Sequence, residues 1–153
     1  MTLSILDRLT DLEPDSKREA RSSNWEDLRV WKASLCRDLA AILNSRRATD
    51  EIDPKYEEVN NSLVAFGVTD FTSCDLLNGI EQERVRRSIE RAIRLFEPRL
   101  TRVAVTMDPL DPLRPLLRFQ INALLRVQPG ETIAFDATLY RDSRRVAVSR
   151  ANS

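Results

Sequence analysis

The apolar pattern changes its period at Glu97-Pro98-Arg99, and this change restricts the chain to folds that join a helix directly to a strand. Over residues 79–97 the apolar side chains recur at the spacing of one helix face, and from residue 100 they alternate as in a strand. Proline disfavours helical dihedrals in the residue before it, so the helix is expected to end at Glu97. Its apolar face consists of Val85, Ile89, Ala92, Ile93 and Phe96.

Two more helices are predicted before residue 79. The first begins at a capping box of Ser23 and Glu26 and ends in the basic stretch NSRR. Its apolar stripe is formed by Leu28, Trp31, Leu35, Leu39, Ile42 and Leu43. The second is shorter, with Asp53 as its cap, Pro54 at its first position and Gly67 as its stop. Its apolar residues are Val59, Leu63 and Phe66.

The second half of the chain has the alternation of antiparallel strands. A first strand opens at Leu100 with an irregular phase, residues 117–125 and 133–139 alternate cleanly, and QPGE is predicted to form the hairpin turn between them. The stretch RRVAVSR at 144–150 is expected to add a fourth strand at a sheet edge. We therefore predict an α+β fold, with about three helices packed on a small antiparallel sheet of three to four strands. Residues 1–22 are predicted to form an arm and flexible link, and residues 23–153 a single domain.

Composition removes several classes of function. The 153 residues include no histidine, which excludes histidine-containing catalytic triads, and two cysteines alone cannot complete a zinc site. We expect no metal and no cofactor. No run of about 18 apolar residues is present, so we expect no direct membrane insertion and a cytoplasmic location. Lysine and arginine together number 24, as do aspartate and glutamate, so the net charge is zero.

Glu97, Pro98 and Arg99 are the first candidate for a binding site. Two interpretations of this tripeptide are open: a helix terminator flanked by solvated charges, or a rigid proline that directs an acid and a base outward at a partner. The second interpretation makes all three residues partner-binding.

An arginine row on the helix over 79–97 is the second candidate. It consists of Arg84, Arg87, Arg91 and Arg94. Glu83 and Glu90 each lie four residues before an arginine, an order that favours ion pairing and partly neutralises the row. The row is therefore open to three interpretations: a solvated face, a protein interface or a nucleic-acid site. The interleaved glutamates, the zero net charge and the lack of aromatic residues among the arginines argue against nucleic acid.

The strand edges and the carboxylates complete the candidates. An exposed edge strand can pair with a strand of another chain, which makes Val103, Val105, Val146 and Val148 candidates for strand pairing. A carboxylate-dependent, lysozyme-like hydrolase would need two acids at a defined separation. The available acids are Glu97, Asp70, Asp75 and Asp136, and no spacing singles out a pair, so we do not expect an enzyme.

Several stretches in order resemble the TssE family, the baseplate wedge subunits of bacterial type VI secretion systems. They are LNSRR, SLVAFGVTDFTS, RAIRLFEPRL, LRFQINALL and IAFDATLY. The family is similar in turn to the small wedge proteins of contractile-phage baseplates. This chain departs from the family pattern at Ala65, where asparagine is usual, and at Thr69, near which proline is common.

The resemblance implies a structural, non-enzymatic part. In the family, the motif carried here by Glu97, Pro98 and Arg99 contacts the wedge core bundle of TssF and TssG. The resemblance further implies a TssK-containing baseplate docked at the inner membrane and a sheet that serves as a template for the TssB/TssC sheath. We expect TssF, TssG and the sheath as partners, and no nucleic acid.

Overall fold

The computed structural model describes residues 24–49, 52–71, 74, 78–109, 116–126, 130–140 and 145–151. The predicted arm over 1–22 and the Ser23 end of the predicted capping box lie outside the described residues. The elements, in chain order, are α2 (Asn24–Asn44), α3 (Glu57–Asn60), the 3-10 turn η1 (Leu63–Ala65), α4 (Gly79–Phe96), β1 (Leu100–Met107), β2 (Leu116–Leu125), β3 (Thr132–Tyr140) and β4 (Arg145–Arg150).

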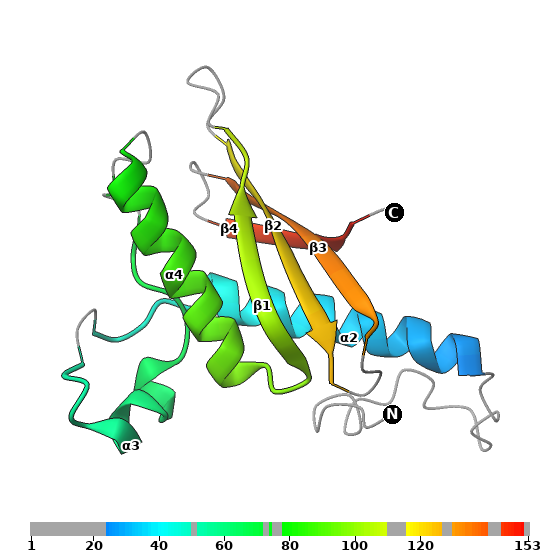
Figure 1. The fold of residues 1–153 in the computed structure, drawn as a ribbon, viewed down its shortest axis with the longest axis horizontal. Helices are drawn as coiled ribbons and strands as arrows, with labels where there is room; N and C mark the ends of the chain where they lie inside the picture. Colours follow the sequence, from blue (N-terminus) through cyan, green and yellow to red (C-terminus); the bar gives the residue numbers. More distant parts are fainter. Residues whose placement is uncertain are drawn as a thin grey trace.

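The described residues form an α+β fold with a four-stranded antiparallel sheet, which confirms the predicted fold class. The strands pair in chain order, β1-β2-β3-β4, so β1 and β4 are the two edges. Figure 1 shows α2 crossing behind the sheet and α4 lying beside β1. Both helices lie on the same face of the sheet, and none of the described helices covers the opposite face.

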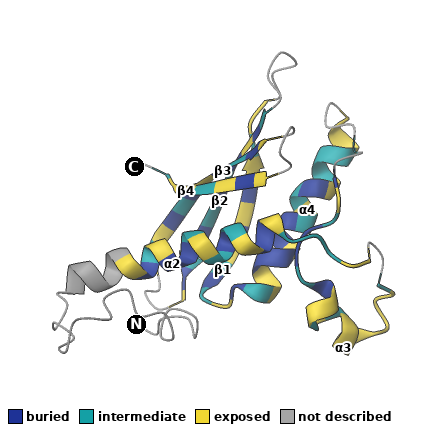
Figure 2. Ribbon diagram, turned by 180° about the vertical axis from the view of Figure 1, so that it is seen from behind, coloured by how far each residue is buried: buried dark blue, intermediate teal, exposed yellow. Residues whose placement is uncertain are grey.

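The core lies between the sheet and the two long helices, where the dark blue segments meet in Figure 2. The predicted apolar stripes supply it: Trp31, Leu35, Leu39, Ile42 and Leu43 from α2 are buried, as are Val85, Ile89, Ala92 and Ile93 from α4. Strands β2 and β3 alternate buried and accessible residues as their sequences predicted. The periodicity of apolar residues in the sequence therefore identified the four longest elements, which are α2, α4, β2 and β3.

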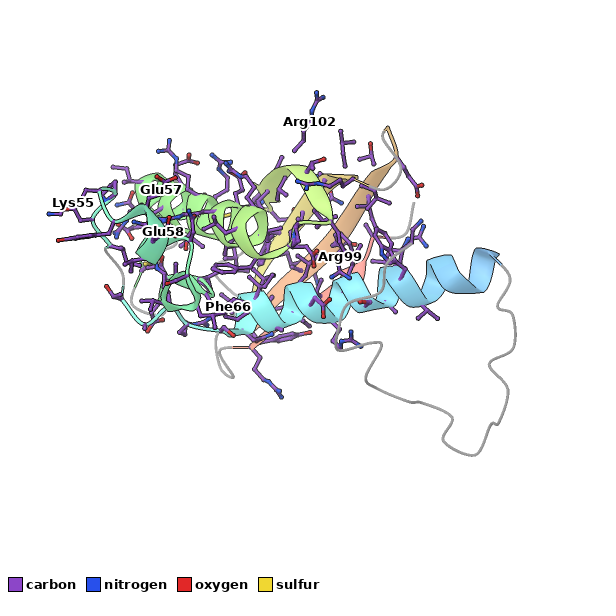
Figure 3. The ribbon with its side chains drawn as sticks, turned by 90° about the horizontal axis from the view of Figure 1, so that it is seen from below. Lys55, Glu57, Glu58, Phe66, Arg99 and Arg102 are labelled. Carbon is purple, nitrogen blue, oxygen red and sulfur yellow. The ribbon has the colours of Figure 1, made fainter. Side chains whose placement is uncertain are left out.

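The irregular phase of β1 has a structural cause. The register of β1 against β2 shifts between Thr101 and Ala104, as at a β-bulge, and Arg102 takes a φ of 51°. The shift allows Val103 and Val105 both to be buried, although Val103 lies three residues after the buried Leu100. Figure 3 shows the Arg102 side chain pointing away from the body of the molecule.

The second predicted helix is wrong as a continuous element. Only Glu57–Asn60 is α-helical, and a separate 3-10 turn follows at Leu63–Ala65. Ser62 divides them, because it has extended dihedrals and its hydroxyl accepts a hydrogen bond from the N–H of Val64. The expected apolar stripe is also exposed in part, with Leu63 83% exposed. Figure 3 places Lys55, Glu57 and Glu58 at the outer end of this segment.

Gly67 is the predicted stop of that segment, and it does take a positive φ, of 96°. A Cβ atom at this position would lie 2.4 Å from the backbone oxygen of Ser45. The close approach brings the end of α2 against the chain before α4, where the N–H of Val68 donates to the Ser45 oxygen at 3.0 Å. Glycine is required here by both the dihedral and the contact.

Candidate partner-binding site

The corner between α4 and β1 places Glu97, Pro98 and Arg99 in a tight turn. Glu97 is the C-cap residue of α4, and its N–H donates to the Ile93 oxygen at 2.8 Å. The N–H of Leu100 then donates to the Glu97 oxygen at 3.1 Å and starts the strand. The helix ends at the proline boundary that the sequence predicted, and the Pro98 ring is exposed at the tip of the turn.

Arg99 turns back onto Glu97 and onto α2. Its Nε donates to Glu97 Oε1 at 2.7 Å, and its Nη2 donates to Glu97 Oε2 at 2.5 Å. The same Nη2 donates to Asp38 Oδ2 at 2.5 Å, and Nη1 donates to the hydroxyl of Ser34 at 3.2 Å. Figure 3 shows Arg99 lying against α2. The guanidinium therefore joins α2 to the corner.

The outward direction predicted for Glu97 and Arg99 is wrong. Glu97 is only 2% exposed, and the Arg99 side chain is 17% exposed. The physical reason is that the turn brings the two side chains within bonding distance of each other, so the guanidinium and the carboxylate form two charge-assisted hydrogen bonds inside the corner. Of the tripeptide, Pro98 and part of Arg99 are accessible to a partner.

Ser34 and Asp38 are parts of the site that sequence reasoning missed. Both lie on α2, four residues apart, and Ser34 is buried between core residues. The signal was present: a serine beside Leu35 and an aspartate beside Leu39 interrupt the core-facing side of a helix. Nothing in the local pattern indicated that an arginine some 60 positions later would bond to them.

Arg99 stays charged in this environment. Burial by itself lowers the pKa of Arg99, but the hydrogen bonds and charges of Glu97, followed by those of Asp38, outweigh burial and raise the pKa. The Arg99 guanidinium therefore keeps its positive charge in neutral solution.

Each arginine of the row bonds to a side chain of the same protein. Arg84 bonds to Glu81 at 3.1 Å, Arg87 to Glu83 at 2.6 Å, and Arg94 to Glu90 at 3.2 Å. The last two are the pairs that the four-residue spacing predicted. The fourth member, Arg91, donates to the Asn60 side chain of α3 at 2.6 Å. The four arginines of the row are exposed on one face of α4, as predicted, and three of them are paired with glutamates of the same helix.

The edge of β1 is held by a buried carboxylate. Glu90 of α4 is 7% exposed, and its Oε1 accepts a hydrogen bond from the backbone N–H of Val105 at 3.0 Å. The same carboxylate bonds to Arg86 at 2.5 Å and to Arg94. Val103 and Val105 direct their side chains into the core. Part of the β1 edge is therefore already used inside the chain.

The edge of β4 is held at one residue by Asn44 at the end of α2. The Asn44 amide donates to the Val146 oxygen and accepts from the Val146 N–H, both at 2.9 Å. Backbone groups of residues two apart on a strand point to the same edge, so Val148 directs its N–H and C=O outward beside those of Val146. Val146 is buried and Val148 is half-buried.

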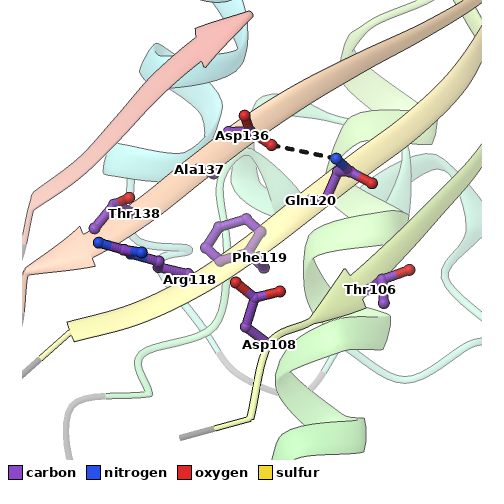
Figure 4. A pocket seen from close by; sticks show the side chains of 8 residues that line it. All are labelled: Thr106, Asp108, Arg118, Phe119, Gln120, Asp136, Ala137 and Thr138. Atoms are coloured by element: carbon purple, nitrogen blue, oxygen red, sulfur yellow. Dashed lines mark hydrogen bonds between the residues drawn. The ribbon is translucent and has the colours of Figure 1, made fainter. Parts of the chain in front are cut away.

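The carboxylates considered for hydrolysis are not gathered into one site. Glu97 is bonded to Arg99 at the corner, Asp70 lies 3.8 Å from Arg46, and Asp136 is exposed on β3. Asp75 lies outside the described residues. Asp136 does line a shallow cavity of about 440 Å³ on the open face of the sheet, where it accepts from Gln120 at 3.3 Å (Figure 4). The other acid there is Asp108, which sequence reasoning did not single out.

The described part of the chain holds no group of three or more Cys, Asp or Glu side chains arranged to bind a metal ion. No helix there has the length and apolar character needed to cross a membrane.

The chain matches a known protein family. A family model described as baseplate wedge protein gp25 matches residues 29–130, which is more than half of the 153 residues. The matched range begins within α2 and ends before β3, so it contains α4, the Glu97-Pro98-Arg99 corner and the first two strands. No curated protein matches the chain.

Proposed function

Because the chain belongs to the family of baseplate wedge protein gp25, we propose that it is a structural baseplate component of a type VI secretion system. The family includes the TssE subunits of those systems. In this proposal the chain links the TssF/TssG wedge of a TssK-containing baseplate to the TssB/TssC sheath, and it helps to start sheath assembly. Its location is cytoplasmic, at a baseplate docked on the inner membrane.

The single observation that carries the proposal is the family match across residues 29–130. The matched range contains the whole corner, including the two α2 residues bonded to Arg99. A role in assembly also agrees with the charge pattern, because Arg84, Arg87 and Arg94 of α4 are each paired with a glutamate of the same helix, which weakens the case for a phosphate site.

The contact with the wedge is assigned to the corner. It is rigid, because the turn is closed by backbone hydrogen bonds on both sides of Pro98 and Arg99 is held by three side chains. A preorganised surface loses little entropy when it binds. Pro98 and the accessible part of Arg99 would meet TssF and TssG.

The contact with the sheath is assigned to β4. The backbone groups of Val148 and Arg150 lie on the same edge as those of Val146, and in the described residues the edge bond from a helix side chain is to Val146, whereas at β1 a buried carboxylate of α4 bonds to Val105. A strand from a sheath subunit would add to this edge through backbone hydrogen bonds.

Co-expression with TssF and TssG, followed by affinity purification, tests the wedge contact. We expect the wild-type chain to co-purify and Arg99→Ala to lose co-purification. Arg102→Ala is the matched control, since Arg102 is an exposed arginine three residues later whose side chain points away from the body. Thermal melting of both variants separates lost binding from lost folding. If Arg99→Ala and Pro98→Ala each co-purify with TssF and TssG as well as the wild-type chain does, the corner is not the wedge contact.

Seeding of sheath assembly tests the second contact. Val148→Pro removes the outward N–H of β4, and Val148→Thr keeps the backbone N–H with a similar side-chain volume. With TssB, TssC and the assembled baseplate, we expect Val148→Pro to reduce the number of sheaths and Val148→Thr to leave it unchanged. Equal seeding by the two variants would exclude β4 as the strand that pairs.

A further inference from the structure

The hydrogen-bond donors of Arg99 are nearly all used within the chain. A guanidinium has five N–H groups. Nε–H and one Nη2–H bond to Glu97, the other Nη2–H bonds to Asp38, and one Nη1–H bonds to Ser34. One N–H of Nη1 therefore remains without a bond to the described residues.

Glu97 is directed wholly at Arg99. Its carboxylate accepts from Nε and Nη2 of Arg99, and Oε1 also accepts from the Arg99 backbone N–H at 3.2 Å. With an exposed fraction of 2%, it offers almost no surface to another protein. Glu97 therefore acts through Arg99 and does not itself contact a partner.

The charge of Arg99 is already compensated. Glu97 and Asp38 both lie within 2.5 Å of Nη2, so two negative charges face one positive charge. Arg37 lies 3.5 Å from Asp38 and is about half exposed, which restores at most neutrality. These four side chains together carry no surplus positive charge, so an acidic group from a partner would gain little from Arg99 and would be repelled by both carboxylates. A neutral carbonyl oxygen is the acceptor that suits the remaining N–H.

We propose that Ser34 and Asp38 of α2 are positioning residues of the partner-binding corner. They direct Arg99 so that its last N–H and the exposed Pro98 ring meet an uncharged, carbonyl-bearing surface of the wedge partner. This inference rests on the proposed function, because the wedge complex is the partner that it describes. The corner thus extends from three consecutive residues to five residues on two elements.

The sign of the effect of Asp38→Asn tests this inference. The variant keeps the size of the side chain but removes one negative charge and weakens the bond to Nη2. If Arg99 meets a carbonyl group and depends on Asp38 for its direction, binding to the purified TssF–TssG complex weakens, by about tenfold. If Arg99 meets an acid, the lost negative charge tightens binding at low salt, which would overturn the proposal.

A second variant and a control complete the test. Ser34→Ala removes the acceptor of Nη1 without changing any charge, and we expect binding to weaken about threefold. Asp136→Asn, on the open face of the sheet, should bind as the wild type does. The dissociation constants are measured by calorimetry, and the melting temperature of each full-length variant is recorded alongside. A weaker constant in a variant that is fully folded at the assay temperature identifies positioning, because a purely structural role would not change it.

The outcomes distinguish this inference from the proposed function. Failure of the wild-type chain to bind TssF–TssG would overturn the proposed function and the inference together. Wild-type binding combined with unchanged binding of both Asp38→Asn and Ser34→Ala would overturn the inference alone.

Discussion

The two edges of the sheet are held in different ways, although one helix side chain bonds to each. On β1, the carboxylate of Glu90 accepts from the N–H of Val105 and is bonded to two arginines of the same helix. On β4, the neutral amide of Asn44 bonds to both backbone groups of Val146. The first arrangement is buried and charged, and the second is partly exposed and uncharged.

The difference lies in what another strand would have to displace at each edge. Burial of the Glu90 carboxylate against β1 depends on Arg86 and Arg94, which compensate its charge. The bonds to β4 come from the neutral amide of Asn44. Under the proposed pairing, a sheath strand would compete with an uncharged amide at Val146 of β4, whereas at Val105 of β1 it would compete with a buried ion pair.

Loss of the carboxylate at the β1 edge has the largest expected effect. Glu90→Ala leaves the N–H of Val105 without its acceptor and Arg86 without one partner, so we expect a loss of about 3 kcal/mol in the free energy of unfolding. Urea denaturation measures this loss. Glu83→Ala is the control, an exposed glutamate on the same helix that bonds to Arg86 and Arg87, and it should cost much less. Equal losses of unfolding free energy for the two variants would show that the bond between Glu90 and Val105 adds no more stability than an exposed ion pair does.

Loss of the amide at the β4 edge has a smaller expected effect. Asn44→Ala removes the two hydrogen bonds to Val146 and one to the Ala40 oxygen within α2, all of them exposed or only partly buried, and we expect a loss of about 1 kcal/mol. Amide hydrogen exchange locates the change: the Val146 N–H should exchange faster, and that of Val105 should keep its rate. If the exchange rates of both amides rise together, the two edges are coupled through the core and are not held independently.

Acid titration has the smallest expected effect on stability, and it concerns Glu83, which shares its partner Arg86 with Glu90. Hydrogen bonds from Arg86 and then Arg87 lower the pKa of Glu83 from 4.5 to about 2. Because the folded-state pKa is the lower one, this contribution to stability is present above pH 4.5 and is lost as the pH falls toward 2. Melting temperatures of the wild type and Glu83→Gln should therefore converge on acidification. A constant difference across this range would contradict the assignment.

Local patterns were sufficient for most of the fold. The face of α4, the alternation of β2 and β3 and the helix end before Pro98 each depend on residues close together in sequence, and each was predicted correctly. The segment after Asp53 was predicted wrongly, because Ser62 provides a local hydrogen bond that competes with the helix. Tertiary packing does not correct this break, since Val59 and Leu63 remain exposed.

The candidate site was predicted in its position but not in its geometry. The sequence located Glu97, Pro98 and Arg99 at a rigid corner, and the acid-base spacing on α4 predicted the pairs of Glu83 with Arg87 and of Glu90 with Arg94. It did not indicate that Glu97 is buried, that Asp38 and Ser34 bond to Arg99, or that Glu90 reaches Val105. These contacts join residues on different elements, and no local period describes them.

The sequence by itself determined the secondary structure on each side of Pro98, the alternation that directs one face of the sheet to the core, and the ordered stretches that resemble the TssE family. These features depend on spacing along the chain and on the dihedral limits of proline. Only the tertiary structure decided which charges are buried and which helix side chain bonds to each strand edge. It did so because α2 packs against the corner and α4 lies beside β1, and burial and charge compensation depend on those neighbours in space.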